Sequence, residues 1–258
     1  MDMCLIFGSF GYLGFELTKQ LLDKGMPVIH VDISDDAEPD DYVEEKHLWV
    51  GRNGNFTIAE KDEEIDWSRI QAVIIPLYDW QYFFEEDKQK VIDRLKKAIV
   101  HFPNRPLKIV IIESVDHPLQ GNFLITKKEK WSFINVAIPA LYGGWQPKQS
   151  YFFQLWQKKK IVENGIPLDT INVYDVAEGL IRIMELEKEG SFIMKNADAN
   201  RLRECITYLT EDDPIAIAKE RYDLLKSDET RGVIPIKETV DFRKVLQELE
   251  VINTLHEK

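Results

Sequence analysis

The stretch that decides the fold is FGSFGYLGFEL, residues 7–17, in which three glycines recur at intervals of three. The apolar run Met3–Phe7 precedes it and predicts a short buried strand. Leucine spacing over 12–24 predicts a helix that stops at Gly25. A strand, a glycine-rich turn and a helix start together form an anion site, because backbone N–H groups point outward there and the helix dipole is positive. The sequence therefore predicts a loop able to hold a phosphate.

An acidic residue follows at the distance that a dinucleotide site requires. Asp32 ends the second predicted strand, PVIHVD, and a carboxylate there can accept hydrogen bonds from the adenosine ribose. Asp35 and Asp36 come next and would repel a 2′-phosphate, so NAD is favoured over NADP. A purely structural turn is the alternative interpretation. The residues predicted to contact the cofactor are Gly8, Ser9, Phe10, Gly11, Tyr12, Leu13, Gly14 and Asp32.

Strand and helix signals alternate along the first 150 residues, and each predicted strand is nearly all apolar. This alternation predicts an α/β fold with a doubly wound parallel sheet covered by helices on both faces, as in Rossmann-like proteins. Further strands are predicted at 47–50 (HLWV), 72–77, 107–114, 133–144 and 191–196, and helices at 85–101, 151–157 and 174–190. The acidic stretch 35–45 is predicted to lie outside the core. We predict a core over 1–150, followed over 151–258 by completing elements and a small, mostly helical C-terminal lobe.

Composition excludes several classes of function. The formal net charge of the 258 residues is -12, which disfavours nucleic acid as a partner because phosphate backbones are bound by positive surfaces. Only Cys4 and Cys205 are present, so no disulfide framework or metal-ligand spacing is expected, and a reducing cytoplasm is the simplest compartment. No apolar stretch reaches the roughly 18 residues that a membrane span needs. We therefore expect a cytoplasmic protein without a metal site.

Three segments together resemble a known family. GSFGYLGFELTKQLLDKGMPVIHVD resembles the N-terminus of the extended short-chain dehydrogenases/reductases, the nucleotide-sugar epimerases and dehydratases. FINVAIPALYGG resembles the strand that ends in Tyr-Gly-Pro in that family, and INVYDVAEGLIRIMEL resembles a later helix. The resemblance implies a dinucleotide-binding fold and a small-molecule or nucleotide-sugar ligand.

The catalytic residues of that family are only partly present. The resemblance implies a Ser or Thr after the fifth strand, which Ser114 matches, and a Tyr-x-x-x-Lys motif on the next helix, which has no match. Only residues 115–132 separate Ser114 from the next predicted strand, too few for that helix, and the nearest remnant, 123–127 (FLITK), has Phe in place of Tyr. Because this helix contributes to the four-helix dimer interface of the family, we do not expect that dimer to form.

Two functions therefore compete. One is a catalytically degenerate protein that senses a dinucleotide or acts as a scaffold for a protein partner. The other is an active NAD-dependent epimerase, dehydratase or reductase that uses Ser114 with an unusual base, for which Asp116 and His117 are the candidates. Phe10 replaces a small residue of the family loop, and its bulk is expected to crowd a phosphate. The missing tyrosine favours the first function.

Overall fold

The structure is a computed structural model that describes residues 3–31, 42–61, 64–83, 85–117, 128–158, 166–186, 189–210 and 231–256. The strands are β1 (Met3–Phe7), β2 (Val28–Val31), β3 (Phe56–Ala59), β4 (Ile70–Pro76), β5 (Leu107–Ser114), β6 (Trp131–Ile138), β7 (Ala140–Tyr142), β8 (Thr170–Asn172), β9 (Gly190–Asn196) and β10 (Gly232–Ile236). The helices are α1 (Tyr12–Asp23), α2 (Val43–Val50), α3 (Glu85–Ile99), α4 (Tyr151–Lys158), α5 (Val173–Glu185), α6 (Arg201–Thr210) and α8 (Phe242–His256), and a 3-10 helix, η2, spans Leu77–Tyr82.

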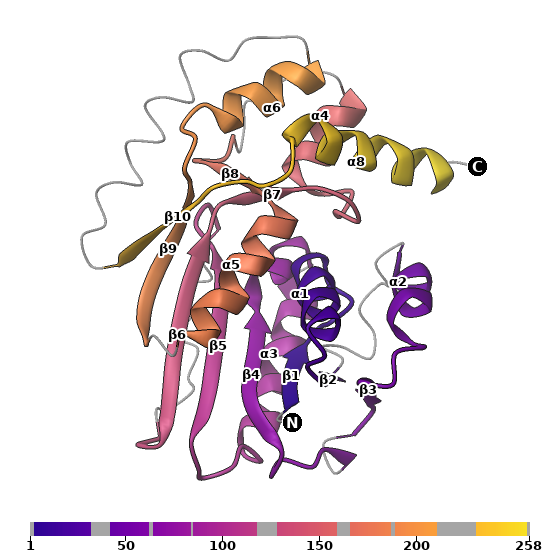
Figure 1. The fold of residues 1–258 in the computed structure, drawn as a ribbon. Helices are drawn as coiled ribbons and strands as arrows, with labels where there is room; N and C mark the ends of the chain where they lie inside the picture. Colours follow the sequence, from indigo (N-terminus) through magenta and orange to yellow (C-terminus); the bar gives the residue numbers. More distant parts are fainter. Residues whose placement is uncertain are drawn as a thin grey trace.

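Eight strands form one sheet in the order β10-β9-β6-β5-β4-β1-β2-β3, and every pair in it is parallel (Figure 1). The side chains of alternate residues in β1 point to opposite faces of this sheet. Cys4 and Ile6 pack into the core beneath α1 and α5, whereas Leu5 and Phe7 pack into the core beneath α3. The predicted doubly wound parallel sheet is confirmed, and its nearly all-apolar strands follow from burial on both faces.

The chain after residue 150 adds elements to the main sheet and also forms a separate helical cluster. Strands β9 and β10 extend the main sheet beyond β6, and α5 packs beside α1 (Figure 1). Helices α4, α6 and α8 pack around a separate apolar cluster at the carboxyl end of the sheet, next to the two-stranded sheet of β7 and β8. No helix in the described ranges combines the length and apolar character that crossing a membrane demands.

Helix α2 corrects two predictions. HLWV belongs to the end of this helix rather than to a strand, and the third strand is FTIA, β3. The apolar residues of HLWV suggested a buried strand, but Leu48 and Trp49 are 69% and 66% exposed. The neighbouring Lys46 is buried instead. Tyr42, from the stretch predicted to lie outside the core, is only 1% exposed, because its ring packs against Trp145.

The apolar run 133–144 was predicted as one strand but forms two. Pro139 separates β6 from β7, because a proline cannot donate the backbone hydrogen bond that a continuous ladder requires. Strand β7 then pairs with β8 in the small sheet. Neither β8 nor β10 was predicted. Strand β8 has only three residues, and β10 lies in a region whose polar composition suggested helix.

Candidate functional site

The glycine loop forms the tight turn between β1 and α1. Gly8 has φ 80°, and its carbonyl accepts the N–H of Gly11 at 3.0 Å. A Cβ on Gly14 would lie 2.1 Å from that same carbonyl oxygen, so only glycine lets the first turn of α1 approach β1 this closely. The helix begins at Tyr12 without a side-chain cap on Gly11, which leaves its first N–H groups pointing out of the loop. This is the geometry of an anion cradle.

An internal carboxylate lies in that cradle. Asp79, from η2 at the end of β4, accepts the N–H of Leu13 on one oxygen and the N–H of Gly14 on the other, both at 2.9 Å. The residue is 3% exposed. Its Oδ2 would lie 2.4 Å from a Cβ on Gly11, so the acid packs directly against the loop. The helix N-terminus therefore binds an anion, and that anion belongs to the chain itself.

Phe10 does not occupy the cradle. Its ring lies against His30, with centroids 4.6 Å apart, and also contacts His47 and Phe56 at 5.8 and 6.0 Å. The expectation that Phe10 crowds a phosphate is thus replaced by the finding that Asp79 fills the position. The Phe10 side chain thus lies toward β2, β3 and α2, where these aromatic partners partly bury it.

Lys46 and His30 hold the outer part of the loop. The Nζ of Lys46 donates to the carbonyl of Phe10 at 2.9 Å, and this lysine has no exposed surface. The Nδ1 of His30 accepts the N–H of Ser9 at 3.1 Å. Asp32, predicted to bind the ribose, lies outside the described residues. The loop is consequently fixed from two neighbouring elements, β2 and α2, by contacts that the sequence analysis missed.

Two hydroxyl groups beside the cradle are buried without a hydrogen bond to any described residue. They are the Oγ of Ser9, which is fully buried, and the phenol of Tyr12, which is 1% exposed. Burial raises the pKa of the Tyr12 phenol well above its usual value, and Tyr78 and Asp79 nearby add to this, so the group is a neutral donor. Buried hydroxyls usually have partners, so this pair keeps hydrogen-bonding capacity that no described residue uses.

The three candidate catalytic residues lie at or just beyond the carboxyl end of β5. The Oγ of Ser114 accepts the N–H of His117 at 3.2 Å, which closes the turn after the strand, and Ser114 is 3% exposed. The carboxylate of Asp116 accepts the N–H of Leu168 at 2.9 Å, and the His117 side chain is exposed. Ser114 and Asp116 thus each accept a backbone hydrogen bond that has a structural role. The segment 123–127 lies outside the described residues.

Tyr142 belongs to a buried polar network in the C-terminal part. Its hydroxyl donates to Glu238 at 2.6 Å, and the same carboxylate faces the Nε of Arg201 at 2.9 Å and accepts the N–H of Asn172 at 2.8 Å. Burial raises the pKa of the Tyr142 phenol far above its usual range, with Cys205 and Glu238 contributing. A phenol that keeps its proton and is bonded to a carboxylate orients the lobe rather than transferring protons.

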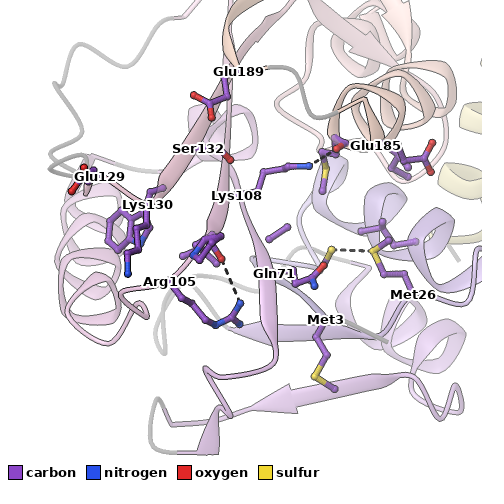
Figure 2. A pocket seen from close by; sticks show the side chains of 18 residues that line it. Met3, Met26, Gln71, Arg105, Lys108, Glu129, Lys130, Ser132, Glu185 and Glu189 are labelled. Carbon is purple, nitrogen blue, oxygen red and sulfur yellow. Dashed lines mark hydrogen bonds between the residues drawn. The ribbon is translucent and has the colours of Figure 1, made fainter.

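A separate cavity of about 610 Å³ opens at the amino-terminal ends of the strands, the end opposite to the glycine loop (Figure 2). It is lined by the first residues of β1, β5 and β6, whereas ligands of open parallel sheets bind at the carboxyl ends. Two of its cations have partners: Lys108 donates to the Met184 carbonyl, and Arg105 donates to the Ser68 carbonyl at 2.7 Å. Burial raises the pKa of the Cys4 thiol to about 12, which makes it unreactive.

Among the described residues, no three His, Cys, Asp or Glu side chains come together as metal ligands. No protein-family model matches the chain, and the search of curated proteins finds no match. Solved structures do match. The UDP-glucuronic acid 4-epimerase of Bacillus cereus, in complex with NAD, is 15% identical with a TM-score of 0.63, covering 99% of this chain and 100% of that one.

Two further solved structures are similar over the whole chain. Yeast methylglyoxal/isovaleraldehyde reductase, complexed with NADPH, is 14% identical with a TM-score of 0.58 and 99% of each chain covered. The dTDP-glucose 4,6-dehydratase of Bacillus anthracis, in complex with NAD, is 12% identical with a TM-score of 0.57, covering 100% of this chain and 98% of that one. At these identities the likeness shows the fold alone.

The cradle as folded does not fit a dinucleotide. A pyrophosphate at this turn would take the N–H groups of the first helical turn, and Asp79 already holds those of Leu13 and Gly14. The sequence carried one signal for this arrangement, an acidic residue in YDWQYFF directly after a buried strand. Because the carboxyl ends of β1 and β4 are adjacent in the sheet, an acid at this place in the chain falls next to the glycine loop.

Proposed function

We propose that this chain, which has an extended short-chain dehydrogenase/reductase fold of the NAD-dependent epimerase and dehydratase type, is a non-catalytic dinucleotide-sensing protein. The dinucleotide would take the anion cradle in place of Asp79, with Asp32 bonded to its ribose. The acids around Asp32 favour NAD over NADP. The proposal leaves out catalysis because the Tyr-x-x-x-Lys motif of the family has no match on the segment that follows Ser114.

One observation carries the proposal: the carboxylate of Asp79 is bonded to two N–H groups of the glycine loop. It supports anion binding, since the helix N-terminus holds a negative group at hydrogen-bond distance. It also supports the absence of catalysis. An enzyme that turns over its substrate with a bound cofactor gains nothing from an internal ligand in the cofactor site, whereas a sensor requires an empty state that is stable.

Calorimetric titration with NAD, NADH and NADP tests the proposal. We expect heat of binding with NAD and NADH, and weaker binding of NADP. Asp32→Asn should weaken NAD binding by about tenfold, the effect of losing one charge-assisted hydrogen bond. The matched control Asp93→Asn, an exposed change on α3, should leave binding unchanged.

A turnover assay separates the sensor from the enzyme. The solved structures with this fold include an epimerase acting on UDP-glucuronic acid and a dehydratase acting on dTDP-glucose, so these nucleotide sugars are the substrates to offer. We expect neither product formation nor reduction of NAD. Turnover that is lost in Ser114→Ala would establish the competing enzyme function. No heat with any dinucleotide would remove the sensing function.

A further inference from the structure

The 3-10 helix η2 is bonded at neighbouring residues to two different parts of the molecule. Asp79 binds the glycine loop, as described above, and the hydroxyl of Tyr78 accepts the N–H of Leu141, the middle residue of β7, at 2.8 Å. Tyr82 in turn donates to the Tyr78 hydroxyl at 3.4 Å. One short helix therefore connects the cradle to the small sheet that begins the C-terminal lobe.

Side chains of η2 also reach both faces of the main sheet. Tyr78 is 1% exposed in the core beneath α1 and α5, and Trp80 is fully buried in the core beneath α3. Tyr78 and Trp80, two positions apart in η2, thus pack into two separate cores. A movement of the backbone at Asp79 is consequently transmitted to Tyr78, because densely packed side chains shift between discrete arrangements rather than deforming continuously.

Rotation of the Asp79 side chain alone cannot open the cradle. The Cβ of Asp79, the first atom of its side chain, lies 3.2 Å from the position that a Cβ on Gly11 would occupy, so η2 places the base of this side chain against the loop in every rotamer. Turning the carboxylate away leaves this Cβ where it is. Space for a phosphate beside Gly11 therefore requires η2 to withdraw from the loop.

We propose that η2 is a gate whose closed state is held by Asp79, and that the pyrophosphate of a dinucleotide opens it and releases the Tyr78–Leu141 hydrogen bond. This inference rests on the proposed dinucleotide function and names its regulation. Closure costs affinity, since the apparent dissociation constant rises as the open fraction falls. The hydroxyls of Ser9 and Tyr12, which bond to no residue in the described ranges, supply hydrogen-bonding groups to the open state.

Calorimetric titration of the full chain with NADH tests the gate. Asp79→Asn keeps the size of the side chain but removes its charge and one acceptor, so the closed state weakens. We expect NADH to bind at least about tenfold more tightly than to the wild type. The control Asp93→Asn, the same substitution on the exposed face of α3, should bind NADH like the wild type.

The titration distinguishes failure of the gate from failure of the function. Equal NADH affinity in wild type and Asp79→Asn would keep the sensing function and overturn the gate. Absence of binding in both would overturn the function and the gate together. Should Asp79→Asn fail to fold, hydrogen exchange on the wild type provides an independent measurement.

Hydrogen exchange of single amides tests whether NADH releases the hydrogen bond between Tyr78 and Leu141. We expect saturating NADH to accelerate exchange of the Leu141 amide by about tenfold or more, while the amide of Val110, in the middle of β5, stays protected. Tyr78→Phe should give fast exchange at Leu141 even without NADH. NADH binding that leaves exchange at Leu141 unchanged would overturn the coupling to β7.

Discussion

At the scale of single residues, Gly14 decides whether the loop can form. A Cβ at this position would lie 2.1 Å from the Gly8 carbonyl oxygen, well inside contact distance, and the neighbouring atoms belong to rigid backbone. Gly14→Ala should therefore lower the free energy of unfolding by about 3 kcal/mol or more, a loss typical of strain in a special turn. Urea unfolding measures it.

The matched control is Gly54→Ala. A Cβ on Gly54 meets nothing within 4 Å, and its φ is not positive, so the change should stay within about 0.5 kcal/mol of the wild type. If Gly14→Ala unfolds at the same urea concentration as Gly54→Ala, the close approach of α1 to β1 is not what the glycine spacing provides.

At the scale of elements, a buried acid connects β8 to β9. The carboxylate of Asp169, 2% exposed, accepts the N–H of Thr170 and the N–H of Asn196, both at 2.7 Å. Burial raises its pKa from 3.8 to about 7 despite these hydrogen bonds, so the folded protein binds a proton that the unfolded chain releases. This contribution to stability is full below pH 4 and is lost as the pH rises through 7.

The pH dependence of unfolding tests this assignment. Between pH 4 and pH 8 the wild type should lose stability relative to Asp169→Asn, at about 1.4 kcal/mol for each unit of pKa shift that is realised. The Asn variant lacks this titration but keeps all the others, so the difference between the two unfolding profiles isolates it. Parallel profiles across this range would contradict a raised pKa at Asp169.

The same elements show how far local sequence patterns reach. Long apolar strands such as β5 were predicted because their pattern is repeated over eight residues. Strand β8 has three residues and β10 contains Pro235, so neither presents a pattern that differs from a loop. Both strands form because β7 and β9 present backbone N–H and C=O groups with which they can pair. Such pairing depends on the assembled sheets and not on the local sequence.

At the scale of the whole molecule, the two predicted parts share one core. The core beneath α1 includes Leu17 and Leu21 from the first 150 residues and Val176, Leu180 and Met194 from the rest. A fragment of residues 1–150 would expose this apolar surface and the unpaired edge of β6. We expect it not to fold cooperatively, unlike the full chain. A sharp thermal transition of the fragment, followed by circular dichroism, would contradict this.

The sequence by itself determined the parallel sheet, the glycine turn and the poor match to the family's catalytic residues, because these depend on local periodicity and on which residue types are present. The prediction that the family's dimer does not form stays a prediction. Only the tertiary structure decided what the loop holds. Asp79 is 65 residues from Gly14 in the chain, and the parallel order of β1 and β4 brings its carboxylate to the helix N-terminus. A contact between segments so far apart depends on sheet order, which no local pattern encodes.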